Sequence, residues 1–512
     1  TMGLMFVVSL SNLVTQAQIS KQKGITYTSN WSGGYSHPDS ALALPHVKAT
    51  GANWISLIVT RYQDDISSTT IYATPGTETD TGLIDAITQA HNLGLKVMLK
   101  PHLDLANDPT HWRAEIGQGF TEAQWAAWFA SYQAFITHYA HLAQDHAVDQ
   151  FCIGVELSTP QSRDSNWRTV IASVRSHYSG PITYAANWDA TDLTWWDAVD
   201  YIGVDAYYYP LTNKKDPTVA ELKLAWQPYV TSLAALASTW NKSILFTEIG
   251  YHSQDGIDQC PYWCWQPYGT IDLQEQADHY QALFEAVYNQ PWFAGIFWFV
   301  WYPSPFDGGS CDSSFSPHDK PAEDVLRTWY GAPPRIPDTP QPQPQPNYER
   351  KLVIYADSLG SGWENWSWDS VVDLSSTNPV YSGTRAISVT AQPGGALCFY
   401  HLKFGPSSYY WLEFYIRGSS VSQEFRAFIY DENGVMLRYL PVCRYAEGEM
   451  IEPGIWKRAR LPLSDLNATG RLVENVCINN WSEVPFSYWV DEIRLLGATW
   501  KTYLPVVIKN RQ

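Results

Sequence analysis

Residues 80–102 read DTGLIDAITQAHNLGLKVMLKPH and hold one helix together with the strand that follows it. Asp80 opens the stretch as a residue type that caps helix N-termini, and an apolar stripe with helical spacing runs from Leu83 to Ala90. Gly94 supplies a helix stop, after which an apolar run of strand length begins at once. The stretch therefore predicts one helix–strand unit of an α/β fold.

The same unit recurs up to about residue 330. Eight short β-rich runs follow one another in the order GITYTS, WISLIVT, KVMLKPH, FCIGVEL, PITYAAN, YIGVDAYYY, ILFTEIGY and GIFWFVWY. Helical patterns separate them, for example over 121–143, 165–178, 216–240 and 272–290. Eight units predict a closed (β/α)8 TIM barrel of parallel strands. An open doubly wound sheet is disfavoured, because the SNWSGGY that follows the first strand is not the phosphate loop G-x-G-x-x-G.

The chain of 512 residues is longer than one barrel needs. Residues 333–347, PPRIPDTPQPQPQPN, alternate proline with polar residues and predict an extended polyproline linker. We therefore expect a barrel over 19–332 and a second domain over 348–498, with a further strand or tail over 499–512. Alternating runs such as RAISVTAQ, YYWLEFYIRG, EFRAFIYDENG and YWVDEIRLLG predict that the second domain is an all-β sandwich or jelly roll.

Composition limits the partners of the protein. The formal net charge is −18 and no long Lys/Arg run occurs. The chain therefore lacks the basic surface that a protein needs to bind nucleic acid or an anionic membrane. No later segment approaches about 18 uninterrupted apolar residues, so we expect no membrane span. Aromatic residues make up 15% of the chain, with 25 Trp and 32 Tyr, and flat rings suit the apolar faces of sugars, although core packing is the alternative. These features favour an uncharged partner.

The N-terminus and the cysteines predict export. Residues 1–18 contain a short apolar run followed by small and polar residues, as in the later part of a signal peptide. Of seven cysteines, Cys152 lies in a predicted buried strand and is expected to be a free thiol, while the other six fit one or two disulfides of open connectivity. A zinc site is the less favoured alternative, with ligands drawn from Cys260, Cys264, Cys311, His252 and His318. We expect a secreted or cell-surface protein.

Two glutamates end otherwise apolar strands. Glu156 follows Phe151–Val155 on the fourth predicted strand, and Glu248 follows Ile244–Thr247 on the seventh. In a barrel the carboxyl ends of these strands face each other across the mouth, where active sites lie. Two carboxylates on opposite sides of a bound sugar can hydrolyse a glycosidic bond, with Glu248 attacking and Glu156 transferring the proton. The alternative is that each glutamate only pairs with a basic residue at the rim.

Other polar and aromatic residues at strand ends are candidates for contact with a sugar. The aromatic ring on the last strand comes from either Trp298 or Trp301, since alternation prevents both from facing the same way, and we favour Trp298. We expect Tyr207 to donate its hydroxyl to Glu248, whereas Lys100 has the alternative of neutralising Asp104 or Asp205. The full set of predicted substrate contacts is Trp31, Lys100, His102, Asn187, Trp188, Asp205, Tyr207, Trp298 and Trp301.

The motifs FCIGVELS and FTEIGY resemble the strand-four and strand-seven signatures of clan A glycoside hydrolases. GITYTSNWSGGY and YIGVDAYYYP make residues 24–330 most similar to the family 113 β-mannanases. The resemblance implies retaining endo-hydrolysis of β-1,4-mannosidic bonds without a catalytic cofactor, with Glu156 as acid/base and Glu248 as nucleophile. Most clan A families carry Asn before the acid/base, whereas Val155 stands here, so a contact to the sugar 2-hydroxyl must come from elsewhere.

The second domain, with Trp363, Trp366 and Trp368, resembles a carbohydrate-binding-module jelly roll. Domains of this shape commonly hold a structural calcium ion, for which Asp357 and Asp491 are the candidate ligands, and a mere spacer domain is the alternative. For the whole chain we expect a monomer that acts on a polysaccharide or oligosaccharide. Two readings compete with a mannanase: a hydrolase or transglycosylase acting on another β-linked glycan such as glucan or chitosan, and a non-catalytic glycan-binding surface protein.

Overall fold

A computed structural model describes residues 21–29, 31–259, 270–335, 350–420, 423–482 and 484–497. The expected signal-peptide remnant at 1–18, most of the linker and the tail at 499–512 lie outside the described residues, as do Cys260 and Cys264. Among the described residues, every helix falls short of the length and apolarity that crossing a membrane requires.

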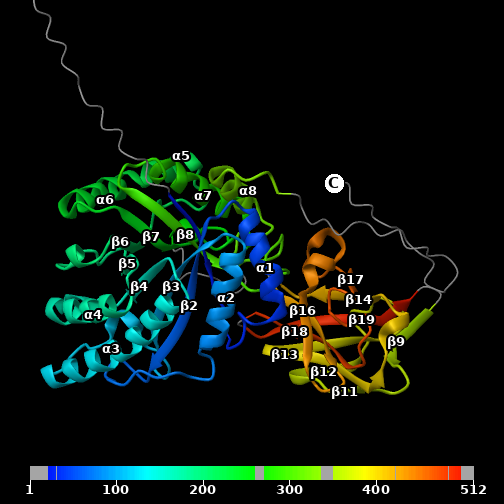
Figure 1. Ribbon diagram of the computed structural model, residues 1–512. Helices are drawn as coiled ribbons and strands as arrows, with labels where there is room; N and C mark the ends of the chain where they lie inside the picture. Colours follow the sequence, from blue (N-terminus) through cyan, green and yellow to red (C-terminus); the bar gives the residue numbers. More distant parts are fainter. Residues whose placement is uncertain are drawn as a thin grey trace, which may run out of the picture.

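The first part of the chain is a closed barrel, as predicted. Each of its eight strands pairs in parallel with the next, and β8 closes the sheet onto β1 (Figure 1). Because helices or loops cover the outside and side chains fill the inside, the strands are buried on both faces and are apolar almost throughout. The strands are β1 (Gln22–Tyr27), β2 (Trp54–Gln63), β3 (Lys96–Leu105), β4 (Gln150–Val155), β5 (Ile182–Asn187), β6 (Tyr201–Asp205), β7 (Ile244–Ile249) and β8 (Phe293–Trp301).

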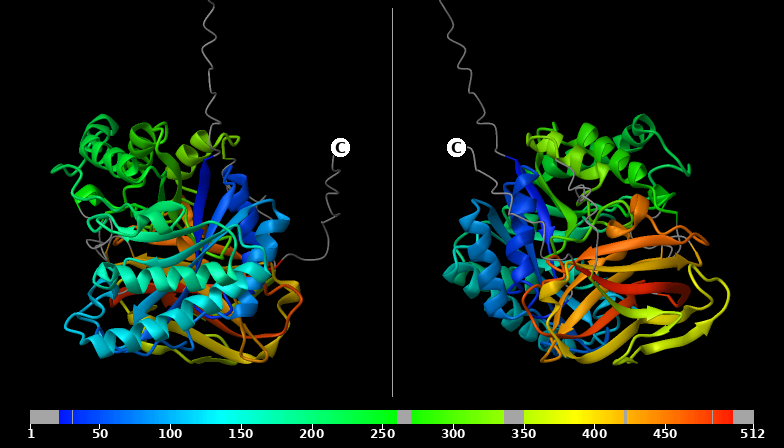
Figure 2. Two further views of the ribbon diagram at one scale, coloured as in Figure 1. Left: turned by 60° about the vertical axis from the view of Figure 1, so that its left-hand side comes forward. Right: turned by 90° about the vertical axis from the view of Figure 1, so that its right-hand side faces the viewer.

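Helices form the outer layer of the barrel (Figures 1 and 2). The single helix expected over 216–240 is two helices, because Pro228 at the start of the second lacks an N–H and its ring opposes a continuous helix. Between β5 and β6 a short 3₁₀ turn, Trp196–Ala198, takes the place of the expected helix. The helices are α1 (Pro38–Ala49), α2 (Asp80–Asn92), α3 (Glu122–Asp145), α4 (Asp164–His177), α5 (Val219–Ala225), α6 (Gln227–Trp240), α7 (Leu273–Val287) and α8 (Pro321–Tyr330).

The second part of the chain is an antiparallel all-β region with its own apolar core, also as predicted. The long strand β13 lies at its centre and pairs with β11, β12, β18 and β19. The strands are β9 (Arg350–Ala356), β10 (Ser358–Leu359), β11 (Trp363–Asn365), β12 (Trp368–Ser376), β13 (Ala386–Phe404), β14 (Trp411–Gly418), β15 (Phe425–Asp431), β16 (Met436–Pro441), β17 (Lys457–Pro462), β18 (Val473–Asn480) and β19 (Phe486–Gly497).

The two parts are docked against each other rather than held apart. Strand β16 lies beside α1 (Figure 1), where Arg438 of β16 forms a bidentate ion pair with Asp39 in the first turn of α1. Further along, Arg426 pairs with Asp307, and both side chains are only 9% exposed. These ion pairs are largely removed from solvent and join oppositely charged surfaces of the two domains.

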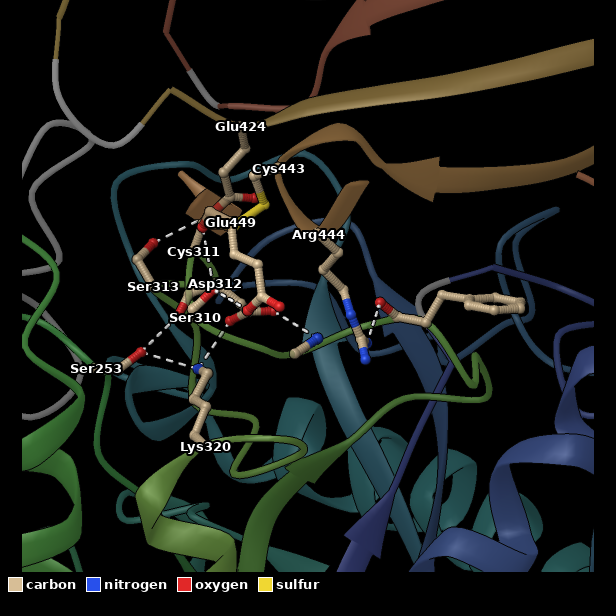
Figure 3. The surroundings of a disulfide bond; sticks show 12 residues. Ser253, Ser310, Cys311, Asp312, Ser313, Lys320, Glu424, Cys443, Arg444 and Glu449 are labelled. Atoms are coloured by element: carbon tan, nitrogen blue, oxygen red, sulfur yellow. Dashed lines mark hydrogen bonds and ion pairs between the residues drawn. A yellow bond between two sulfur atoms is a disulfide. The ribbon is translucent and has the colours of Figure 1, made fainter. Parts of the chain in front are cut away.

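Two disulfides are present among the described cysteines. Cys398 and Cys477 join the neighbouring strands β13 and β18. Cys311, in the loop after β8, is bonded to Cys443 of the second domain, so one disulfide crosses the domain boundary (Figure 3). Cys152 is buried and free, as predicted. The zinc alternative that used Cys311 was wrong, because its sulfur is committed to the disulfide.

Candidate active site

The two predicted glutamates lie at the carboxyl ends of their strands. Glu248 belongs to β7 and is 9% exposed, while Glu156 immediately follows β4. Glu156 has φ of 52°, a left-handed conformation that side-chain-bearing residues rarely adopt and that is typical of functional positions. Its N–H donates to the Ala185 carbonyl of β5 at 2.8 Å, which holds this turn in place.

Both oxygens of the Glu248 carboxylate accept a hydrogen bond. The Lys100 ammonium donates to Oε2 at 2.7 Å, and the Tyr207 hydroxyl donates to Oε1 at 2.9 Å, as predicted for this tyrosine. A hydrogen bond at each oxygen, one of them from a cation, fixes the orientation of the carboxylate. Glu248 is therefore held as an aimed carboxylate at the cavity wall.

Lys100 bonds to carboxylates of the protein, and its burial leaves it no contact with a sugar. Its ammonium also bonds both Asp205 oxygens, at 3.1 and 3.2 Å, and Thr247 donates its hydroxyl to Asp205 at 2.7 Å. Burial lowers the pKa of Lys100, but the charges of Asp205 and Glu248 outweigh it and hold the pKa above its usual value. Lys100 and Asp205 are wholly buried, so the predicted substrate contacts at these two residues were wrong.

The surroundings of Glu156 favour its protonated form. Burial, then the negative charges of Asp205 and Glu248, raise its pKa to about 8, although the cations of Arg113 and Lys100 counteract them. At neutral pH this carboxyl therefore carries a proton. Glu248 lines the cavity and Glu156 is bonded to the cavity residue Arg113, so a proton donor and a second carboxyl group lie near the same cavity, as acid-assisted nucleophilic attack requires.

Arg113 completes the cluster and escaped prediction from the sequence. It lies in a 3₁₀ turn, Arg113–Glu115, between β3 and α3. Its guanidinium donates to Glu156 at 3.3 Å, to Asp104 at 2.8 Å and to Nδ1 of His102 at 3.2 Å. Nothing in the local pattern HWRAE distinguishes this arginine from a surface residue, because only the folded loop turns it towards the strand ends.

His102 remains a candidate for substrate contact. Burial and the nearby cations of Arg113 and Lys100 hold its pKa well below the usual value, so the ring is neutral. Because Nδ1 accepts from Arg113, the assigned tautomer carries its proton on Nε2, which is buried at the cavity wall without a protein partner. This N–H is available to a sugar hydroxyl.

The cavity has a volume of about 410 Å³, within the usual range for small-ligand sites. Its walls come mainly from the ends of β1, β2, β3, β7 and β8 and from the loop after β2. Polar groups converge on it, and Phe299 provides an aromatic side. The lining residues are Thr28, Ser29, Ile58, Val59, Thr60, Tyr62, Gly76, Glu78, His102, Arg113, Glu248 and Phe299.

The predicted aromatic platform on β8 was wrong. Trp298 is fully buried and stacks on Tyr280 of α7 with ring centroids 3.6 Å apart, so it faces the helix layer. Trp301 is 1% exposed and packs on His318. Phe299 lines the cavity instead. The expectation that alternation keeps Trp298 and Trp301 on opposite faces was also wrong, because both belong to the same apolar cluster and the register of β8 with β1 shifts between them.

The remaining predicted contacts lie outside the cavity wall. Trp31 is 47% exposed in the loop after β1, close in sequence to the cavity residue Ser29. Asn187 donates to Asp189 at 2.8 Å, and half-buried Trp188 packs on Tyr208 and Tyr209. The structure therefore brings Glu156, Glu248, His102 and Tyr207 together. Asn187 lies in register with Asp205 on the neighbouring strand, and contact of Trp31, Asn187 and Trp188 with a sugar stays a prediction.

The two carboxylates predicted to bind calcium accept hydrogen bonds from backbone N–H groups. Asp357 accepts backbone N–H groups of Thr384 and Arg385, and Asp491 accepts those of Tyr381, Ser382 and Glu492. Both therefore anchor the loop before β13. Two carboxylates already bonded to N–H donors do not fit the six to eight oxygens that calcium takes (about 2.3–2.6 Å away), and we assign no ion to them.

Comparison with known proteins identifies the family to which the barrel is similar. The model of Glycoside Hydrolase Family 113 matches residues 25–320. A GH113 β-mannanase from Alicyclobacillus acidocaldarius, solved in complex with ManMIm, is 30% identical, and the match covers 61% of this chain and 97% of that one with a TM-score of 0.54. A GH113 β-1,4-mannanase, also solved as a complex, is 28% identical over 61% of this chain and 99% of its own, with a TM-score of 0.55.

No curated protein sequence matches the chain significantly. The second domain lies beyond residues 25–320, so the family match concerns the barrel that carries Glu156 and Glu248. More than half of the 512 residues fall within that match. The protein is therefore a glycoside hydrolase, and the chain belongs to glycoside hydrolase family 113.

Proposed function

We propose that the protein is an endo-acting β-1,4-mannanase that hydrolyses its substrate with retention of configuration. The observation that carries the mechanism is the paired state of the two glutamates. Lys100 and Tyr207 donate hydrogen bonds to the two oxygens of Glu248, while the environment of Glu156 raises its pKa to about 8. The mannan substrate is supported by the family and by the two β-mannanases of similar structure.

In the first step, a Glu248 oxygen attacks the anomeric carbon of the sugar bound in the cavity. Glu156 gives its proton to the departing glycosidic oxygen, so that the bond breaks as the glycosyl–Glu248 ester forms. Tyr207 and Lys100 hold the attacking carboxylate in position until the reaction begins. The loss of negative charge on Glu248 in the ester removes one of the charges that raise the pKa of Glu156.

In the second step, Glu156 is ionised and acts as a base. It takes a proton from water, and the water oxygen attacks the anomeric carbon and displaces Glu248. Two inversions at the same carbon give net retention. Glu156 regains its proton and Glu248 its charge, which restores the starting state.

Substitution of the two glutamates tests these roles separately. E248Q removes the attacking carboxylate, and we expect no measurable turnover of mannan or of activated aryl glycosides. E156Q removes only the proton donor, so turnover of mannan falls by about 10²–10⁴-fold, while an aryl glycoside whose leaving group needs no proton still forms the ester. If E156Q slowed both substrate types equally in the first step, the assignment of roles would be wrong.

The identity of the glycan is tested by comparing substrates. We expect reducing-end release from mannan and glucomannan to exceed release from cellulose, laminarin and chitosan. If the enzyme preferred one of the other glycans, the roles proposed for Glu156 and Glu248 would stand, but the proposed substrate would be wrong. Binding of glycans without turnover by the wild-type protein would instead favour a non-catalytic binding protein.

One surface of the second domain favours an additional role in glycan binding. Trp366 is 52% exposed and lies flat on Tyr400, with ring centroids 4.0 Å apart and planes 11° from parallel. An exposed, rigid aromatic face suits stacking on a sugar ring. We expect W366A to weaken binding to insoluble mannan without changing kcat on short oligosaccharides, whereas V371A, at an exposed residue on β12, serves as a control. Unchanged binding by W366A would leave the domain without this role.

A further inference from the structure

Three acidic side chains meet at the catalytic end of the barrel, outside the cavity. Asp216 lies between β6 and α5, Asp255 lies between β7 and α7, and Glu275 belongs to the first turn of α7. Each contributes a carboxylate oxygen, and these oxygens all lie within 4.8 Å of one another. Asp216 and Asp255 are 39 positions apart in the sequence, so two separate loops meet at this point.

Glu275 is buried with part of its carboxylate unsatisfied. The residue is only 5% exposed, and Oε2 accepts the Gly256 N–H at 2.7 Å. Its other oxygen, Oε1, is buried and has no hydrogen-bond partner, and the same is true of Oδ1 of Asp255. Burying a polar oxygen without a partner is costly, and such groups are rare in folded proteins. The unsatisfied oxygens indicate that a ligand able to bind carboxylate oxygens belongs between them.

The charge around this point is strongly negative. Asp272 and Asp258 add further negative charge near Glu275, beside that of Asp255. Lys215 brings a positive charge to the site, because it pairs with Asp255 and its charge also acts on Asp216 and Glu275. Its side chain is 70% exposed, and an exposed lysine contributes little to such a cluster. Among the described residues, no buried cation is paired with the three carboxylates.

We propose that Asp216, Asp255 and Glu275 bind a divalent cation of the calcium type. Calcium prefers carboxylate and carbonyl oxygens at about 2.3–2.6 Å, so two of its ligands lie up to about 5 Å apart, a spacing that the three oxygens already satisfy. The ion replaces the contact with Lys215, whose long exposed side chain can turn to solvent. Binding supplies partners for the unsatisfied oxygens and removes the mutual repulsion of the cluster.

The ion would fasten two loops that shape the catalytic end. The loop before Asp216 begins at β6, next to Tyr207, whose hydroxyl bonds Glu248. The same loop contacts the other one where the Leu211 N–H donates to the Asp258 carbonyl at 3.2 Å and Thr212 donates its hydroxyl to the Asp258 carboxylate. Calcium binding therefore adds a second fastening between loops that already touch, and it is independent of which glycan the enzyme cleaves.

The test is thermal unfolding of the full chain after metal removal with a chelator. We expect millimolar Ca²⁺ to raise the melting temperature of the wild-type protein by several degrees, and Mg²⁺ to raise it less, since a ligand that binds only the folded state stabilises it. E275Q and D255N should lose this response. E285Q removes a charge from the exposed face of the same helix and should respond like the wild type.

Exposed Asp216 offers a variant with little risk to folding, and D216N should respond to Ca²⁺ only at higher concentration. Metal analysis of protein equilibrated with Ca²⁺ should give one ion per chain in the wild type and none in E275Q. A wild-type melting temperature that ignores Ca²⁺ would overturn the proposal. A chelated E275Q protein that is more stable than the wild type, combined with no bound ion in either, would show that a proton on Glu275 satisfies the cluster instead.

Discussion

Lys100 is the residue on which the charge balance of the active site depends. It is 0% exposed and pairs with both Asp205 and Glu248. Removing one partner of a buried ion pair leaves charge without compensation, which usually destabilises a protein by about 3–5 kcal/mol. In this site the loss also affects the chemistry, because Lys100 donates a hydrogen bond to the attacking carboxylate of Glu248 and helps to hold it in position.

For K100M we therefore expect lower stability to denaturant, by about 3–5 kcal/mol, and a large loss of kcat. The double variant K100M/D205N lacks one of the two orphaned charges, so it should regain part of the stability without regaining activity. Equilibrium unfolding and initial rates on mannan-derived oligosaccharides measure both effects. Wild-type activity in K100M would show that Glu248 does not need this lysine.

Arg113 sets the pH range in which Glu156 can act as an acid. Its charge counteracts the burial and the carboxylates that raise the pKa of Glu156 to about 8. A proton donor works below its pKa, so wild-type kcat/KM should fall as the pH rises through about 8. Without the cation the pKa of Glu156 rises further, and for R113A we expect this alkaline fall at higher pH.

The control for that pH profile is R168A. Arg168 pairs with Asp164 and Asp197 at the surface, so its loss should leave the alkaline limb where it is. An unchanged limb in R113A, or one that moved to lower pH, would contradict the role of Arg113.

At the scale of single residues, the sequence was sufficient for some side chains at strand ends, although the sugar contacts expected at Asp205 and on β8 were wrong. Glu156, Glu248 and Tyr207 were predicted because the carboxyl end of a barrel strand has a known position relative to the other strands. Arg113 and Glu78 were not, since they lie in loops. Glu78 accepts the N–H groups of Gly33 and Tyr35 and so fixes the loop after β1, a relation between distant segments that no local pattern reveals.

At the scale of elements, neighbouring side chains of β8 have different roles, because one packs against a helix and the next lines the cavity. Trp298 packs into the helix layer on Tyr280, whereas Phe299 lines the cavity. We expect W298A to lower the stability by about 3–5 kcal/mol, as for other buried aromatic residues, with KM unchanged. F299A should instead raise KM by about 2–10-fold, because the lost aromatic contact is worth about 0.5–1.5 kcal/mol.

Thermal unfolding and steady-state kinetics on the two variants check this division. The reverse pattern, in which W298A raises KM and F299A only destabilises, would show that β8 presents its other face to the substrate. Each variant is the control for the other, because the two residues are neighbours on one strand.

Helix and strand positions were predicted well where the pattern was long and regular, as over α3 and β2. The errors fell where a local feature overrode the pattern. Pro228 divides the expected helix at 216–240, and the β5–β6 connection contains the short turn Trp196–Ala198 in place of a helix. At Pro228 the chemistry of one residue, rather than the hydrophobic pattern around it, decided the structure.

At the scale of the whole molecule, the loop between β8 and α8 belongs to the barrel and makes contacts that hold the second domain against it. Lys320 is buried and bonds the hydroxyl of Ser253 and the carboxylate of Asp312, next to the Cys311–Cys443 disulfide (Figure 3). Across the boundary, Ser313 donates to Glu424 at 3.1 Å. The loop is thus fixed on one side to the barrel and on the other to the second domain.

The loop also reaches the active site through Phe315. Its ring packs on Phe299, which lines the cavity, and on Tyr207, which bonds Glu248. The second domain is therefore attached to a segment that supports the cavity wall. The linker sequence predicted a boundary, but it could not predict this docking, because the contacts join residues more than 100 positions apart.

Loss of the disulfide between the domains should be measurable as loss of stability. Cys311 and Cys443 are separated by 132 residues, and a cross-link that closes a long loop typically contributes about 2–4 kcal/mol. We expect C311S/C443S to unfold at a lower temperature than the wild type, and a reductant to affect the double variant less than the wild type. Peptide mapping without reduction should recover the two cysteines in one cross-linked fragment. Separate fragments would contradict the pairing.

The stereochemistry of the first product tests the central claim most directly. A β-1,4-linked mannan oligosaccharide is mixed with the enzyme, and the anomeric protons of the newly formed reducing end are followed by NMR before mutarotation. If Glu248 attacks carbon and Glu156 delivers and later removes the proton, the β-anomer appears first. First release of the α-anomer would contradict the account, since it would mean that water displaces the leaving group directly.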